Sequence, residues 1–111
     1  MAQYIIRHRF TDAPLFTVVA DSFKKAVEAA VRAGTSLANA NLAGQDLRGA
    51  QLQGGVFTGA DCARVKFDDA VTRGADFTNA ILTKATMLNV LAHGMILTAA
   101  ELTQFQQRTT I

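Results

Sequence analysis

Residues 39–62 read NANLAGQDLRGAQLQGGVFTGADC, and from Leu42 onward every fifth residue of this stretch is leucine, phenylalanine or cysteine. The same register continues in both directions along the chain. Its members, most of them large and apolar, are Leu37, Leu42, Leu47, Leu52, Phe57, Cys62, Phe67, Thr72, Phe77, Leu82, Met87 and Ala92. A second series runs two residues earlier, from Thr35 to Val90, and consists mainly of small residues. A period of five fits neither an α-helix, with about 3.6 residues per turn, nor the alternation of a strand. Residues 35–94 are therefore predicted to form a repeat with its own geometry.

The repeat contains stretches with a recognisable motif. They are Asn39–Gly44, Gly49–Gly54, Gly59–Cys62 and Gly74–Thr78. These stretches resemble the A-(D/N)-(L/F)-x-x pattern of pentapeptide-repeat proteins, and the register holds over 60 of the 111 residues. The resemblance implies a mainly β fold, a right-handed quadrilateral β-helix with one pentapeptide per side. Four pentapeptides per coil would give residues 35–94 three coils.

Residues 20 apart would stack in such a coil. Asp46 then lies over Lys66, and Arg48 lies over Asp68, which predicts a ladder of alternating charge. Exposed ion pairs of this kind contribute about 0–1 kcal/mol each.

Some outward positions depart from the family pattern. Val56, Val71 and Ile81 stand where a polar residue is expected, and exposed apolar residues of this kind suggest a contact surface. Arg64 over Lys84 is a stack of like charge, which is either a contact for an anion or partner or a pair of solvated cations that point apart. The candidate partner surface comprises Val56, Arg64, Lys66, Val71, Ile81 and Lys84.

Residues 1–34 are predicted to form an N-terminal cap. Residues 4–10 and 15–19 read as two strands of a β-hairpin around a turn that contains Pro14. A helix follows, with Asp21 or Ser22 as its N-cap and Gly34 at its C-terminal end. Its apolar face is formed by Phe23, Ala26, Val27, Ala30 and Val31, with Lys24, Lys25, Glu28 and Arg32 outside it.

Residues 95–111 are predicted to form a C-terminal helical cap. Thr98 and Glu101 have the spacing of a capping box, and a cap would cover the open edge of the last coil. This segment is more apolar than a plug requires, and in larger pentapeptide-repeat proteins this end often supports dimerisation. The candidate dimer or cap interface comprises Leu91, Met95, Ile96, Leu102 and Phe105.

Composition indicates a soluble, cytoplasmic protein, and the resemblance to phage and prophage proteins described below implies that the cell is a bacterial host. No apolar run approaches the roughly 18 residues of a membrane span, and the single cysteine, Cys62, has no partner for an internal disulfide. The formal net charge is +2, and the excess lies within residues 1–34. The candidate basic cap comprises Arg7, Arg9, Lys24, Lys25 and Arg32, although a solvated face is the simpler interpretation.

The sequence contains no catalytic constellation. His8 and His93 have no acidic or cysteine neighbours at metal-ligand spacing. Cys62 falls at an inward position of the repeat, where cysteine behaves as a small hydrophobic residue. We therefore expect neither an enzyme nor a bound cofactor or metal.

The function predicted from these features is that of a protein-interaction module. The layout of hairpin, helix and repeat resembles small pentapeptide-repeat proteins of phages and prophages. That resemblance implies an inhibitor of a host complex that handles nucleic acid, of the anti-CRISPR or anti-restriction type, acting by occlusion of a surface. One alternative is a DNA mimic that binds a type II topoisomerase such as gyrase, and another is a direct nucleic-acid binder acting through the basic cap. A homodimer through the C-terminal end is a further expectation, and no membrane contact is expected.

Overall fold

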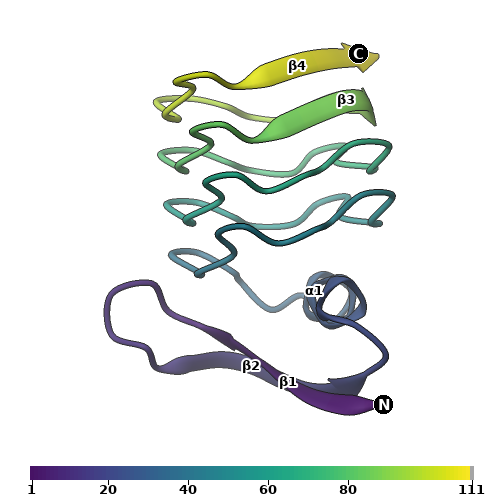
Figure 1. Ribbon diagram of the computed structural model, residues 1–111, viewed down its shortest axis with the longest axis vertical. Helices are drawn as coiled ribbons and strands as arrows, with labels where there is room; N and C mark the ends of the chain where they lie inside the picture. The colour runs from purple at the N-terminus through teal and green to yellow at the C-terminus, as the bar shows by residue number, and fades with distance from the viewer. Residues whose placement is uncertain (111) are drawn as a thin grey trace.

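The computed structural model describes residues 1–110 and shows a cap at one end of a stack of coils (Figure 1). The hairpin and helix predicted for residues 1–34 are confirmed, with Ser22 as the helix N-cap. The elements, in chain order, are β1 (Ala2–Arg7), β2 (Pro14–Ala20), α1 (Phe23–Arg32), β3 (Thr86–Leu91) and β4 (Gln106–Thr110).

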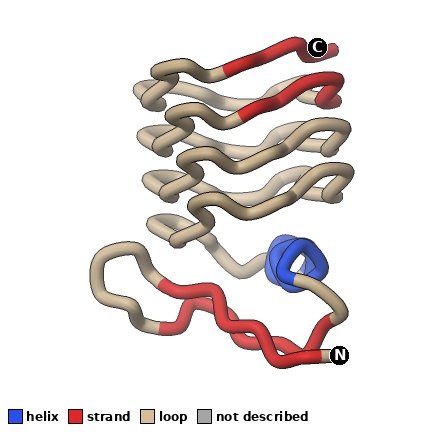
Figure 2. Tube along the Cα trace, in the orientation of Figure 1, coloured by secondary structure: helices blue, strands red, loops and turns tan. Residues whose placement is uncertain are grey.

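The coils are held together by backbone bridges between residues 20 apart. The bridges recur every five residues, from Asn41↔Asp61 to Ile81↔Glu101, so a coil has four sides of five residues each. Each side carries one parallel bridge, which is why most of the stack is drawn as loop and turn rather than strand (Figure 2). The structure thus has the β-helix type of architecture that the repeat predicts. Its right-handedness and the number of coils stay predictions.

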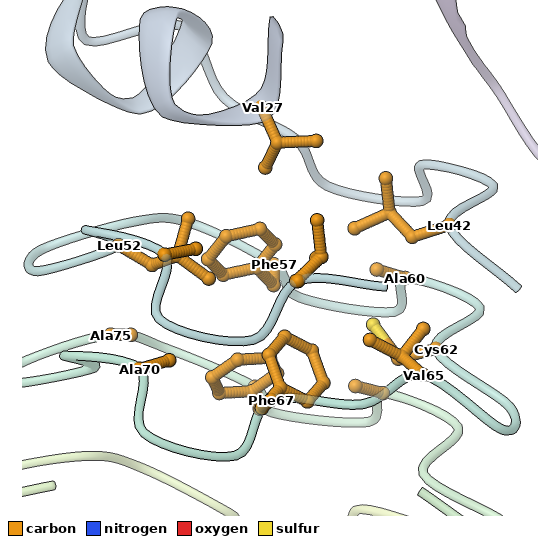
Figure 3. Close-up of a cluster of buried hydrophobic side chains, with 14 of the residues drawn as sticks. Val27, Leu42, Leu52, Phe57, Ala60, Cys62, Val65, Phe67, Ala70 and Ala75 are labelled. Carbon is orange, nitrogen blue, oxygen red and sulfur yellow. The ribbon is translucent and has the colours of Figure 1, made fainter. Parts of the chain in front are cut away.

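The two five-residue series lie in the interior, apart from Thr35 and Gln45 of the small series, which are only partly buried. The large series from Leu37 to Met87 has no exposed surface, and Ala92 is 4% exposed. Phe57 stacks on Phe77 with ring centroids 4.9 Å apart, and Phe67 meets Phe77 edge-on at 5.6 Å. Figure 3 shows Val27 of α1 closing the N-terminal end of this core above Leu42 and Phe57.

One interior column becomes smaller along the stack, from Leu52 to Thr72 to Ala92. Met95 occupies a position of the small series and is packed against the core. The Thr72 hydroxyl donates to the Met95 sulfur at 3.2 Å. A long, flexible side chain therefore fills the room that the small residues leave.

The N-terminal edge of the first coil is covered by the hairpin. The Arg9 amide donates to the Asn39 carbonyl at 2.7 Å, and the Asn41 amide donates to the Arg7 carbonyl at 2.8 Å. His8 and Ala40 form the antiparallel bridge between these two hydrogen bonds. The hairpin thus supplies, on this side, the backbone partners that another coil would supply.

On another side of the first coil, a side chain of α1 supplies the hydrogen-bond acceptor that a preceding coil would supply. Glu28 was predicted to lie outside the buried face of the helix, but it is only 5% exposed. Its carboxylate accepts from the Gln51 amide at 2.8 Å and lies 3.4 Å from the Lys25 ammonium. The equivalent amide one coil later, that of Val71, donates to the Ala50 carbonyl, so Glu28 takes the place of a missing backbone carbonyl.

The predicted C-terminal helix is wrong. Within residues 95–110 the chain keeps the five-residue register, with Ile96 bridged to Asp76 and Glu101 bridged to Ile81. β4 then pairs in parallel with β3. Leu97 and Leu102 simply continue the large apolar series, and the exposed backbone of the preceding coil offers these residues hydrogen-bond partners that an isolated short helix would lack. Ile111 lies outside the described residues.

The Glu28 cap leads to a prediction about stability. Replacing Glu28 by Ala leaves the Gln51 amide without its acceptor, and an unsatisfied buried donor costs about 1–3 kcal/mol. We expect the free energy of unfolding, measured by urea denaturation, to fall by about that amount. Glu28→Gln, whose amide oxygen can still accept, should lose much less. Lys25→Ala removes only the exposed partner of the ion pair and should change stability by about 0–1 kcal/mol. Equal losses in Glu28→Ala and Lys25→Ala would contradict the cap.

Candidate interaction surfaces

The outward residues form four columns, one on each side of the coil. The bridged positions of these columns are Asn41, Asp61, Ile81 and Glu101; Asp46, Lys66, Thr86 and Gln106; Gln51, Val71 and Leu91; and Val56, Asp76 and Ile96. The six residues predicted as one partner surface lie on all four sides. The structure therefore divides them into separate surfaces with different chemistry.

The first surface, which we call the apolar ridge, lies where the third and fourth sides meet. Leu91 is 37% exposed, Ile96 is 42% exposed and Val56 is 40% exposed, whereas Val71 is half-buried. The corner between these two sides is a column of glycines, in which every member has a positive φ. The apolar ridge comprises Val71, Leu91 and Ile96 with the corner residues Gly54, Gly74 and Gly94, and it also includes Val56, which Asp76 separates from Ile96 on the fourth side. The corner carries no side chains, so a partner can approach the backbone closely.

The second surface, which we call the basic corner, consists of Arg64, Lys66 and Lys84. Arg64 and Lys84 stand at the same corner in successive coils, and each has an exposed side chain. Lys66 is the first outward residue on the next side. Within residues 1–110 none of these three side chains makes an ion pair or a hydrogen bond.

The predicted ladder of alternating charge does not form. Arg48 instead binds Asp46 within its own side, with the guanidinium 2.7 Å from the carboxylate. The Asp68 carboxylate accepts from the Leu88 amide at 2.9 Å. The hydrogen bonds from Arg48 lower the pKa of Asp46 to about 2, with a smaller contribution from the charge of Lys66. A partner two residues away is reached with less ordering of the side chain than one in the next coil.

The predicted basic cap is mostly engaged in its own contacts. Arg7 lies 3.9 Å from the Asp12 carboxylate, and Arg9 donates to the Gly59 carbonyl at 2.9 Å. Lys24 donates to the Arg48 carbonyl at 3.2 Å, and Lys25 is the partner of Glu28. Arg32 lines a hollow of 290 Å³ beside Gln51 and Gln53. These cations do not gather on one free surface.

The residues predicted as a dimer or cap interface fall into two groups. Leu91 and Ile96 belong to the apolar ridge. Leu102 is 42% exposed, whereas Met95 and Phe105 are half-buried and packed against the core. The residues of this second group occupy inward positions of the last coil described, so among residues 1–110 they form an uncovered apolar end.

The remaining candidates have structural positions. Cys62 is fully buried, and burial raises the pKa of its thiol. The His8 ring accepts from the Phe10 and Thr11 amides and so stabilises the hairpin turn, whereas His93 is exposed. No group of metal-ligating side chains occurs in the described part of the chain. Among residues 1–110 no helix has the length and apolar character needed to cross a bilayer.

Sequence reasoning missed two features of these surfaces. The role of Glu28 could not be predicted from the sequence, because the helical pattern placed this residue among the solvated charges. The glycine corner did have a signal, because Gly54, Gly74 and Gly94 recur at intervals of 20 residues.

The comparisons with known proteins agree with the geometry of the coils. A family model described as pentapeptide repeats, with 8 copies, matches residues 33–61 and 60–98. No curated protein matches the chain. The matched residues include the bridged sides of the stack and continue past residue 94, the predicted end of the repeat. The chain therefore belongs to the pentapeptide repeat family.

Proposed function

We propose that this chain is a non-enzymatic interaction module that acts by covering a surface of a host complex that handles nucleic acid. Pentapeptide repeat proteins are generally protein-interaction modules, and some of them mimic DNA. The observation that carries the proposal is the apolar ridge. Its exposed residues stand at outward positions that are polar elsewhere in the repeat, such as Asn41 and Gln51.

The ridge has the properties of a preformed binding surface. Coil-to-coil hydrogen bonds fix its backbone, for example from Thr72 to Leu91 at 2.9 Å and from Ile96 to Ala75 at 2.9 Å. A surface that is already ordered loses little conformational entropy on binding. Exposed apolar side chains beside a bare backbone corner can pack closely against an apolar face of a partner.

The proposed setting is the cytoplasm of a bacterium that carries a phage or another mobile element. The support is the layout of a hairpin, a helix and a short repeat, which resembles small phage and prophage proteins. An anti-CRISPR or anti-restriction inhibitor is the function that we infer from this layout. The repeat of residues 35–94 carries five cations and five aspartates, a balance that does not favour mimicry of DNA.

The ridge makes a direct prediction. A tagged chain should capture a complex that handles nucleic acid from host lysate and should inhibit that complex in a purified assay. The double variant Leu91→Asp with Ile96→Asp places charges in the interface, and we expect its affinity to fall at least tenfold, which is about 1.4 kcal/mol. The matched control is Gln3→Asp, an exposed change on the hairpin. If the ridge variant bound and inhibited as well as the unaltered chain, or if no such complex were captured, the proposal would be wrong.

We further propose that the uncovered apolar end binds a second copy of the chain. Leu102 is exposed there, and Phe105, Leu97 and Met95 are only partly buried. The amides of Leu97 and Leu102 occupy positions that, one coil earlier, donate to the next coil. An edge whose amides have no backbone acceptor within residues 1–110, beside an apolar interior, is suited to pairing with the same edge of another copy.

The dimer prediction concerns Leu102. Sedimentation or light scattering should show a dimer for the unaltered chain and a monomer for Leu102→Glu, because a charge would enter the apolar contact. The ridge variant should keep the dimer. A monomeric unaltered chain at about 100 μM, well above a Kd of about 1 μM for a modest dimer, would refute this expectation.

A further inference from the structure

We propose that the basic corner binds an acidic segment of a partner protein. This inference rests on the proposed function, since it names the chemistry of a second contact made by the same module. Arg64 and Lys66 lie on either side of the corner between the first and second sides, and Lys84 lies one coil further along. The apolar ridge is at the diagonally opposite corner, between the third and fourth sides.

The backbone at this corner is unsuited to long side chains. Arg64 and Lys84 both have φ of 61°, in the left-handed region. The other corners of the stack use glycine at this position, a short polar residue such as Asn79, or, once, Ala99, and the next residue of this same corner column is the uncharged Gln104. Glycine and asparagine tolerate this conformation best, whereas other residues are strained in it. The fold therefore does not explain why two long cations stand here.

Among the described residues, the cations at this corner make no ion pair, and only Lys66 acts on a nearby carboxylate, that of Asp46. Stacked coils are about 4.8 Å apart, so Arg64 and Lys84 attach two cations to the same corner of adjacent coils. The N-terminal cations contrast with them, because Arg7 and Lys25 each have a carboxylate within 4 Å. Across the described residues no carboxylate takes that role for Arg64, Lys66 or Lys84. An anion supplied from outside would pair with these cations.

A hollow adjoins the corner at its C-terminal end. It has a volume of 490 Å³, and its walls are Lys84, Thr86, Gln104, Phe105 and Gln106. The Thr86 hydroxyl is buried and, among the described residues, has no hydrogen-bond partner. A cation and amide groups beside a half-buried aromatic ring can hold a carboxylate together with the aliphatic part of its side chain.

The surroundings favour an acidic polypeptide over nucleic acid. The exposed Asp69 lies on the second side, and the same side also carries Asp46 and Asp68. A duplex has a continuous line of phosphates, and its binding requires neutralising many of them at once. These carboxylates would repel such a line, but they leave room for a few acidic side chains at the corner itself. Acidic residues four apart on a helix are about 5–6 Å apart, which matches the spacing of the coils.

The test uses a fluorescent oligoglutamate peptide as the probe and the double variant Arg64→Asn with Lys84→Asn. Asn is the residue that the chain itself uses at equivalent corners, so this variant should fold and melt at the same temperature as the unaltered chain or higher. We expect the unaltered chain to bind the peptide at low salt, with an affinity that falls as salt is raised. The double variant should bind at least about fivefold more weakly. Arg73→Asn, which removes an exposed cation on the third side, should bind like the unaltered chain.

Three outcomes would overturn the proposal. They are no peptide binding at low salt, equal binding by the double variant, and tighter binding of a duplex oligonucleotide of matched charge through the same residues. The ridge variant with Leu91→Asp and Ile96→Asp separates this proposal from the proposed function. It should lose the captured complex but retain peptide binding, so either contact can fail while the other stands.

Discussion

The hydrogen bonds between coils constrain everything else in this structure. Each coil satisfies its backbone only through neighbours 20 residues away, for example when Leu42 donates to Asp61 and Asp61 donates to Ala40. One inserted residue would move every later side chain out of register. The constraint explains why the chain keeps a five-residue period, and why a residue such as Thr72 stays inside even though its hydroxyl needs the Met95 sulfur as a partner.

The same constraint makes the ends of the stack different from its middle. At the N-terminal end, the hairpin pairs with residues 39–41 and Glu28 accepts from Gln51. The helix covers the core with Val27 rather than extending the sheet. At the other end β4 adds one more parallel strand to β3, and the inward Leu102 stays exposed. Among the described residues the two ends therefore differ in chemistry, since a helix and a hairpin cover the N-terminal end and apolar side chains line the other.

The sequence predicted the regular part of the fold because the period of five is a long-range signal repeated many times. Prediction from the sequence failed where one local pattern is compatible with two structures. Thr98 and Glu101 match a helix cap, yet the same residues fit the repeat, and the exposed backbone of the previous coil decides between them. Arg48 was assigned to Asp68 by stacking, whereas the shorter link to Asp46 within one side prevails. The candidate surfaces could be assigned only residue by residue, because their grouping depends on which sides of the coil meet at a corner.

The fold constrains the outward residues much less than the inward ones. Departures from the repeat pattern at outward positions are therefore candidates for binding residues. Arg64 and Lys84 stand at positions that glycine occupies in other coils, and their positive φ strains the backbone there. Leu91 and Ile96 expose apolar surface to water, which is unfavourable. These departures lie at opposite corners of one stack of coils. A rigid body with an apolar ridge on one edge and cations on the other can hold two surfaces of a partner at a fixed separation. Binding at one edge then positions the other without further ordering of this chain, which raises the effective concentration of the second contact. A short repeat can in this way occlude a surface that neither edge would hold alone.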